Sequence, residues 1–250
     1  MKNSTNTIIV VIVTTLAFLL LIGGVTVLTL KPISNLFPPR ENIQLSGTTS
    51  KDWLDSVEHR LKQHGYVIPT GKPTKSSGRL AVYRLTQGDK HYFAKVYVKP
   101  LTSINTTRMK NETEILSKSD GSFAPTLVEQ ITDPQFEILI MTDEGEPVAE
   151  WIKQASYKML SRFLDHVNTM RIRLAKEIGY IHNDLHDKNI VRDGAGTIRL
   201  IDFDLVKEYT GDKSMIDKEA SQLVRLIRHV SVSPQEKERL SDQIKSYSKK

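Results

Sequence analysis

The 250-residue chain contains no cysteine, which excludes disulfide bonds and thiolate metal sites. It also has no strong excess of one charge, because 35 Lys and Arg residues stand against 29 Asp and Glu residues. Only 7% of the residues are aromatic, and no basic stripe with interleaved aromatic residues occurs. Since nucleic-acid recognition depends on such a stripe, we expect no nucleic-acid partner. The 39% hydrophobic and 26% charged residues are typical of a globular protein.

Charged residues are absent from positions 8–30, IIVVIVTTLAFLLLIGGVTVLTL, a run of 23 residues. A helix of this length would rise about 35 Å, enough to cross a hydrocarbon core of about 30 Å. The run is longer than the apolar core of a signal peptide, and no A-x-A-like site ends it. We therefore expect a single transmembrane helix at 8–30 that contacts the lipid bilayer, between an N-terminal tail (1–7) and a linker (31–50).

Residues 51–250 are expected to form one domain, with a strand-rich first half and a helix-rich second half. Apolar alternation on both sides of a Gly-Asp turn predicts two strands within residues 79–99, and a second strand pair is expected within 125–145. A short amphipathic helix is predicted over residues 48–65, with Gly65 at its C-terminus. Another helix is predicted between the two strand pairs, over residues 103–121. In residues 157–182 apolar side chains recur at helical spacing, which predicts one long helix.

The segment YIHNDLHDKNIV, residues 180–191, concentrates polar groups at the end of this long helix. Asp184 is followed five positions later by Asn189, a predicted hairpin comes next, and Asp202 stands in LIDFDLV. Hard oxygen ligands of this kind suit Mg²⁺, which usually takes one or two protein carboxylates and keeps several waters. A hairpin between Asn189 and Asp202 would bring these two side chains together without a long loop.

The first half supplies a lysine and two candidate acids. YFAKVYV places Lys95 in an alternating strand, and NETEIL offers Glu112 and Glu114 on the next helix. Together with Asp184, Asn189 and Asp202, these residues resemble the ordered motifs of the protein-kinase-like superfamily, over about residues 51–230. On this resemblance Glu112 is the preferred partner of Lys95, because it precedes the apolar pair at 115–116 by the family's usual offset.

The resemblance implies an α+β, two-lobed protein-kinase-like fold after the transmembrane helix. A small antiparallel-sheet lobe with one helix (about 51–142) would precede a larger helical lobe (about 146–250), with ATP and Mg²⁺ bound between them. The implied catalytic residues are Asp184, Asn189 and Lys95. The implied ATP contacts are Lys95, Glu112, Gly78, Met141 and Asp143, the last two at a hinge spanning 141–145. The implied Mg²⁺ ligands are Asn189 and Asp202.

The sequence also departs from the family pattern in ways that make it similar to atypical members. The segment TGKPTKSSGRLAVY has only Gly71 and Gly78 where the family has three closely spaced glycines. Asn183 replaces the arginine of the catalytic loop, Asp204 replaces the glycine of D-F-G, and no A-P-E motif follows. His186 is reminiscent of aminoglycoside- and choline-type kinases. In its reduced set of motifs the chain is thus similar to RIO and lipopolysaccharide kinases.

Several alternatives remain open at this point. His186 is either a loop hydrogen-bonding residue or a contact to substrate or phosphate, and His182 is expected to be structural. Asp217 is either a plain acid at a helix N-terminus or the buried acid that braces the catalytic loop. The implied function is transfer of the γ-phosphate of ATP to a Ser or Thr hydroxyl of a protein or membrane-borne acceptor. A small-molecule, sugar or lipid kinase and a pseudokinase scaffold are the alternatives.

The expected placement is a single-pass membrane protein with a cytosolic catalytic domain. ATP is abundant in the cytosol, and Lys31 and Arg40 follow the apolar run while Lys2 precedes it. The sequons at Asn105 and Asn111 support the same placement, because a glycan on Asn111 would stand beside Glu112.

Overall fold

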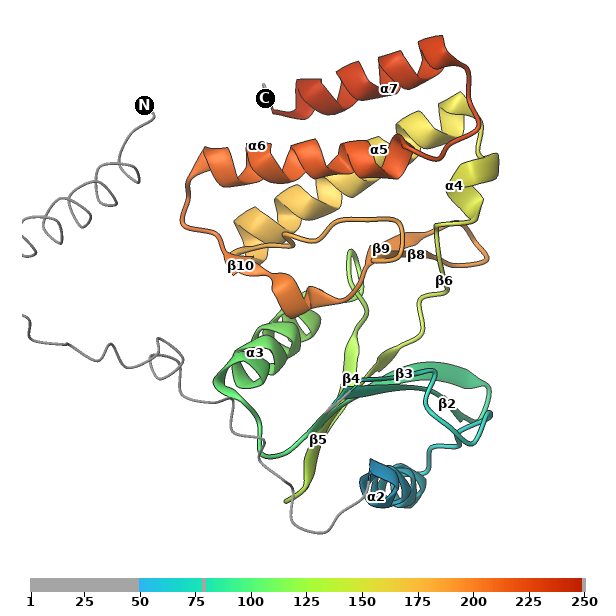
Figure 1. The fold of residues 1–250 in the computed structure, drawn as a ribbon, viewed down its shortest axis with the longest axis vertical. Coiled ribbons are helices and arrows are strands. Elements are labelled where there is room, and N and C mark those ends of the chain that lie inside the picture. The colour runs from blue at the N-terminus through green and yellow to red at the C-terminus, as the bar shows by residue number, and fades with distance from the viewer. Residues whose placement is uncertain (1–49, 78–79, 249–250) are drawn as a thin grey trace, which may run out of the picture. The chain divides into compact units, whose positions relative to one another are not determined.

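The computed structural model describes residues 50–77 and 80–248. The first half of the domain is an antiparallel sheet with the strand order β1-β2-β3-β5-β4 (Figure 1). Its strands are β1 (Lys75–Ser77), β2 (Leu80–Gln87), β3 (Lys90–Val98), β4 (Leu127–Thr132) and β5 (Phe136–Thr142). Both predicted strand pairs are confirmed, and β2 pairs with β3 from Leu80↔Tyr97 to Gln87↔Lys90.

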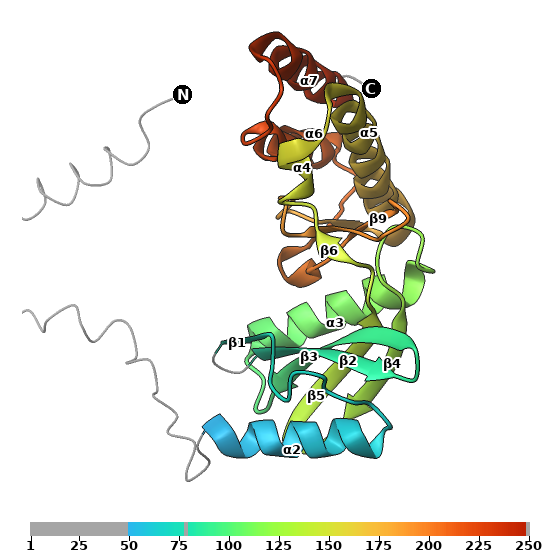
Figure 2. The same cartoon turned by 90° about the vertical axis from the view of Figure 1, so that its right-hand side faces the viewer.

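Two helices cover opposite faces of this sheet, as Figure 2 shows for α2 (Ser50–Gln63) and α3 (Ser103–Lys118). Successive side chains of a strand point to opposite faces of the sheet, so β3 contributes residues to the cores on both faces. Ala94 and Val96 share a core with α2, whereas Tyr97 shares a core with α3. Lys95 is two residues from Tyr97 on the same strand, so its side chain lies on the same face of the sheet, toward α3. The one helix that the family resemblance implies for this lobe is α3, whereas α2 confirms the short amphipathic helix predicted over residues 48–65.

The second half is mainly helical. Its helices are α4 (Trp151–Gln154), α5 (Tyr157–Arg173), α6 (Lys213–Gln222) and α7 (Pro234–Tyr247), with 3-10 turns η3 (Phe203–Leu205) and η4 (Leu223–Ile227). Short strands β6 (Glu146–Pro147), β8 (Ile190–Arg192) and β9 (Ile198–Leu200) form one sheet, and β7 (Tyr180–Ile181) pairs with β10 (Lys207–Glu208). The hairpin predicted after Asn189 is β8–β9.

The long helix predicted over residues 157–182 ends earlier than expected. α5 stops at Arg173 and continues as a single π-helical turn, η2 (Leu174–Ile178). Gly179 then adopts φ +96, in the left-handed region that glycine reaches at no steric cost. The chain can thereby enter β7, whose pairing with β10 takes Tyr180 and Ile181 out of the helix.

One hydrophobic core runs through the second half and reaches the face of the sheet beneath α3. Ile115 and Leu116 of α3 belong to the same cluster as Leu164 of α5 and Phe203 of η3. A backbone hydrogen bond from Leu200 N to Phe123 O (2.8 Å) ties β9 to the segment after α3. The sheet lobe and the helical half are therefore packed against each other through this shared core.

The expected transmembrane helix needs correction. No helix within residues 50–77 and 80–248 is both long and apolar enough to span a bilayer. Residues 8–30, on which the prediction was based, lie outside these ranges. The fold class is therefore reduced to an α+β domain of sheets and helices. The single-pass membrane placement, with its bilayer contact and cytosolic orientation, is not supported.

Candidate active site

Lys95 is the centre of the most concentrated charge cluster in the described part of the chain. Its Nζ lies 2.9 Å from Glu112 Oε2, 3.0 Å from Asp202 Oδ1 and 2.6 Å from Asp204 Oδ1. Tyr97, two residues along β3, donates its hydroxyl proton to Glu112 Oε2 at 2.6 Å, and the same hydroxyl oxygen lies 3.3 Å from Asp204 Oδ1. Strand β3, helix α3 and the segment after β9 thus meet at one ammonium group.

Burial opposes the charged forms in this cluster, but the neighbouring opposite charges outweigh it for two of the groups. Desolvation acts to lower the pKa of Lys95, yet Glu112 and the other acids hold that pKa well above its ordinary value. Desolvation likewise acts to raise the pKa of Asp202, but attraction to Lys95 leaves it below its ordinary value. For Glu112 burial prevails, and its pKa is raised. Lys95 and Asp202 are therefore charged at neutral pH.

The structure places Glu112, and not Glu114, beside Lys95. Glu114 instead accepts hydrogen bonds from Lys118 Nζ (2.7 Å) and from the Tyr180 hydroxyl (2.8 Å). The contact with Tyr180 joins α3 to β7, across the two halves of the domain. Glu114 therefore helps to orient the helix that carries Glu112.

Asp184 and Asn189 lie together in the loop between β7 and β8. Asn189 donates from Nδ2 to the Asp184 carbonyl (3.0 Å) and to Asp184 Oδ2 (3.2 Å). With its nitrogen turned toward Asp184, the amide oxygen of Asn189 is left as the atom able to bind a cation. Ile201 N donates to Asn189 O at 3.0 Å, so the β8–β9 hairpin sets Asn189 opposite the residue before Asp202.

His186 also faces Asp184. Its Nδ1 accepts the backbone N–H of Lys188 (3.2 Å), so a neutral ring carries its proton on Nε2. Nε2 lies 3.5 Å from Asp184 Oδ2, and the His186 side chain is about one-third exposed. The loop hydrogen bond expected as one alternative is present, and the same ring lies beside the Asp184 carboxylate.

A buried acid braces this loop, and it is Glu219 of α6. Glu219 Oε1 accepts the backbone N–H of Asn183 at 3.0 Å, and its other oxygen lies 3.9 Å from Nη1 of Arg171, which is fully buried. Asn183 adopts φ +62 and donates from its side chain to Leu205 O (3.1 Å). Asp217 is only partly buried, and its Oδ1 has no hydrogen-bond partner among the residues described. The residue that contacts the loop backbone is therefore Glu219 and not Asp217, for which this role was one of the two alternatives.

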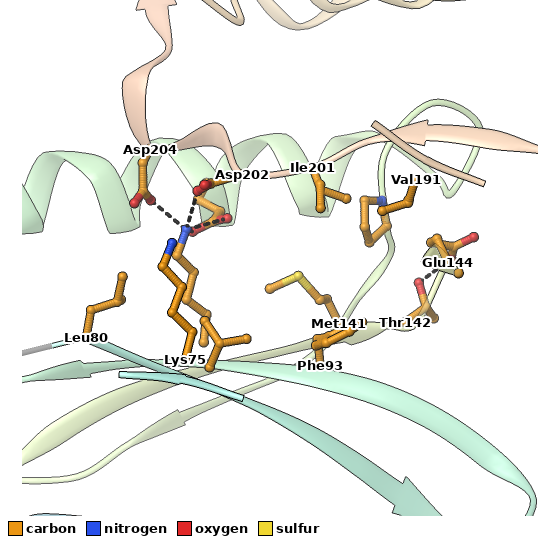
Figure 3. A pocket seen from close by; sticks show the side chains of 15 residues that line it. Lys75, Leu80, Phe93, Met141, Thr142, Glu144, Val191, Ile201, Asp202 and Asp204 are labelled. Atoms are coloured by element: carbon orange, nitrogen blue, oxygen red, sulfur yellow. Dashed lines mark hydrogen bonds and ion pairs between the residues drawn. The ribbon is translucent and has the colours of Figure 1, made fainter. Parts of the chain in front are cut away.

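The cleft beside Lys95 has an apolar end and a charged end (Figure 3). Apolar side chains from the sheet and from the β8–β9 hairpin line the hinge side: Phe93, Met141, Val191 and Ile201. Leu80 lies at the opposite end beside Lys75, and Val82 pairs with Lys95 between the two ends (Figure 3). Lys75, Lys95, Asp202 and Asp204 line the other end. Such a division suits a ligand that joins a flat apolar group to a charged tail.

The hinge borders the apolar end, but not all of its predicted residues do. Met141, Thr142, Glu144 and Gly145 line the cleft, whereas Asp143 does not. Asp143 accepts the Gly145 N–H (2.9 Å) and lies 3.6 Å from Arg84 Nε. Gly78, expected to contact ATP, lies outside the described residues.

Sequence reasoning missed three residues of this site: Tyr97, Lys75 and Glu219. Tyr97 could have been found, because it is two positions from Lys95 on a strand and must share its face. Glu219 could also have been found, because it lies on the buried stripe of α6 with Ile216 and Ala220, at helical spacing. No pattern singles out Lys75, whose position depends on how β1 joins the sheet.

No protein-family model matches the chain. Over 100 residues, 39% of its length, the chain is 30% identical to a serine/threonine-protein kinase named CBK1 of Pneumocystis carinii. The matched region is 20% of that protein, so the chain resembles only a part of it. The comparison indicates a kinase-like relationship over this region.

Proposed function

We propose that this protein is an ATP-dependent phosphotransferase that phosphorylates a hydroxyl group, as a serine/threonine protein kinase does. The observation that supports this most directly is the meeting of Lys95 with Glu112 and Asp202, which lie on three separate elements. The same three residue types position phosphates and metal in the kinase template. Similarity to a serine/threonine-protein kinase over part of the chain supports the same class.

The residues of the cleft fit ATP and Mg²⁺. Val82, Phe93 and Met141 would enclose the base on the hinge side, and the lysines at the other end would face the phosphates. Asp202 and the amide oxygen of Asn189 are the hard ligands that would hold Mg²⁺. When bound, Mg-ATP supplies the phosphoryl group that is transferred.

Asp184 is the residue that acts on the acceptor. Its carboxylate is about one-third exposed and is held by Asn189 Nδ2 on one oxygen, with His186 near the same atom. It can therefore orient an entering hydroxyl group and accept its proton. Glu219 and Asn183 keep the loop backbone in the conformation that presents this carboxylate.

The acceptor is proposed to be a protein hydroxyl, because little structure follows the hinge. Between β6 and α5 there is a single short helix, α4, of 4 residues. Apart from α4, the described residues 146–157 contain no helix that could enclose a small acceptor between the hinge and α5. A small-molecule or lipid acceptor remains the competing proposal, and the same assay separates them.

Transfer of labelled phosphate from ATP by the full-length chain tests the proposal, with protein and lipid fractions offered as separate acceptors. Asp184→Asn should lower the rate by about 100-fold or more, since a positioned acid/base is typically worth 10²–10⁴ in rate. Asp187→Asn, a neighbouring acid of the same loop, is the matched control and should retain most activity. If Asp184→Asn turns over like the parent chain, the assignment fails.

A further inference from the structure

All hydrogen-bond donors of Lys95 are engaged by carboxylates. An ammonium group has three N–H donors, and Lys95 Nζ has three acid partners, Glu112, Asp202 and Asp204, within 3.0 Å. The third partner is Asp204, which stands where kinases carry glycine. The Lys95 side chain is only 8% exposed, so it cannot turn away from these partners without disrupting the cluster. Lys95 therefore has no free donor for an incoming phosphate.

The charge at this end of the cleft is also unfavourable for an anion. Three carboxylates against one ammonium group leave a negative excess when all are ionised. Mg²⁺ bound by Asp202 would offset part of this excess, but Asp204 and Glu112 would still compete with phosphate for Lys95. A second cationic side chain is needed for a phosphate tail to bind strongly.

Lys75 of β1 is in the right place to be that group. It lines the same cleft as Lys95 and is exposed, and its side chain makes no hydrogen bond or ion pair with any other described residue. Figure 3 shows its side chain extending from the sheet toward Asp202 and Asp204. Its charge is close enough to contribute to the lowered pKa of Asp202. Lys75 thus offers unused N–H donors at the charged end of the cleft.

We propose that Lys75 is a second phosphate-binding lysine, which contacts the phosphate tail of a nucleoside di- or triphosphate from β1. In this role it substitutes for the closely spaced glycines that the segment 70–83 lacks. The inference is based on the proposed function, since it concerns how the same cleft binds its nucleotide. Lys95 alone is insufficient to bind the phosphate tail, because Asp204 occupies the third of its N–H donors.

Calorimetric titration of the full-length chain with adenosine, ADP and ATP, each with Mg²⁺, tests this role. Lys75→Met keeps the aliphatic stem and removes the charge. It should weaken ADP and ATP binding about tenfold, the typical contribution of a hydrogen bond to a charged group, and leave adenosine binding unchanged. Lys90→Met is the matched control, because Lys90 is also an exposed lysine of this sheet but does not line the cleft.

A second comparison uses Asp204→Ala, which releases one donor of Lys95. In that background Lys75→Met should weaken ADP binding by clearly less than tenfold, because Lys95 can then share the phosphate contact. Equal losses for adenosine and ADP, no loss at all, or the same loss in Lys90→Met would overturn the assignment of Lys75. If the parent chain binds neither adenosine nor nucleotide, the proposed function itself is wrong and this inference fails with it.

Discussion

His182 shows how a single buried residue connects the fold to pH. It is fully buried between the catalytic loop and the segment that carries Asp202, with Nε2 3.0 Å from Ile201 O and the ring 5.2 Å from Phe203. The carbonyl can only accept, so Nε2 carries the proton, and Nδ1 has no hydrogen-bond partner in the described residues. Burial lowers the pKa of His182 below its ordinary value.

This lowered pKa predicts an acid-sensitive stability. Between the folded and unfolded pKa values the unfolded chain binds more protons, so stability is complete above about pH 6.5 and falls as the pH decreases below it. His182→Gln, which can still donate to Ile201 O, should lose less stability between pH 7 and pH 5 than the parent chain in urea titrations. His59→Gln, at an exposed position, should behave like the parent. Parallel curves for His182→Gln and the parent chain would contradict this prediction.

Glu219 is the second residue for which removal has a predictable cost. Glu219→Ala leaves the Asn183 N–H without an acceptor and removes the acid that lies within ion-pair distance of the fully buried Arg171. Breaking one side of a buried ion pair costs about 3–5 kcal/mol, and the catalytic loop should lose its conformation together with phosphate transfer. Asp217→Ala, two residues earlier on α6, should cost less than about 1 kcal/mol. Similar unfolding midpoints for the two variants would show that Glu219 is not the brace.

At the scale of elements, the hinge between β5 and β6 depends on Gly145. Its φ is +104, and a Cβ at this position would lie 2.3 Å from the Arg192 carbonyl oxygen of β8. Both the backbone conformation and the close approach therefore exclude a side chain. The short β6–β8 pairing, Glu146↔Arg192, places the apolar end of the cleft against the hairpin that carries Asn189.

Gly145→Ala should consequently lower the free energy of unfolding by about 1–3 kcal/mol and weaken nucleotide binding, because the hinge must move away from β8. Chemical denaturation and nucleotide titration of the same sample provide both readouts. Gly194→Ala is the matched control, since a Cβ at Gly194 would meet no atom within 4 Å. Equal stability of the Gly145→Ala and Gly194→Ala variants would show that the hinge tolerates a side chain.

At the scale of the whole domain, residues Thr48–Lys250 group as one compact unit. The core of the helical half extends to α3, and further polar contacts join the two halves at Tyr180–Glu114 and at Arg173–Ser122 (3.0 Å). Lys95 adds the ion pair that links β3 to the segment after β9. These contacts couple the sheet to the helices across the cleft.

Such coupling predicts one cooperative unfolding transition for the domain, which calorimetry can measure. Mg-ATP at a fixed concentration of about 100 times the dissociation constant of the parent chain should add about 2.7 kcal/mol of stability to that chain, since it binds only the folded state. Lys95→Met should reduce this gain, because it removes the charge shared by α3 and Asp202. Two separate transitions, of which Mg-ATP shifts only one, would show that the halves fold independently.

Much of this organisation followed from local patterns. Alternation and the turn at Gly88-Asp89 predicted β2 and β3. The stretch between Asn189 and Asp202 predicted the β8–β9 hairpin. These patterns suffice because a strand's period and a tight turn depend on neighbours in the chain. The extent of α5 was not predictable in this way, because its end depends on the pairing of β7 with a strand 26 residues or more away along the chain.

Only the tertiary structure decided which charged groups meet. Lys95 and Asp202 are separated by 107 residues along the chain, and no local pattern states that Asp204 also reaches the same ammonium group. The choice of Glu219 over Asp217 is likewise set by which face of α6 packs beneath the catalytic loop. The sequence by itself determined the types and order of the residues in the site. It also indicated the elements that carry them, because strand, turn and helix signals are local. Their partners were decided by packing, since burial and distance belong to the folded chain alone.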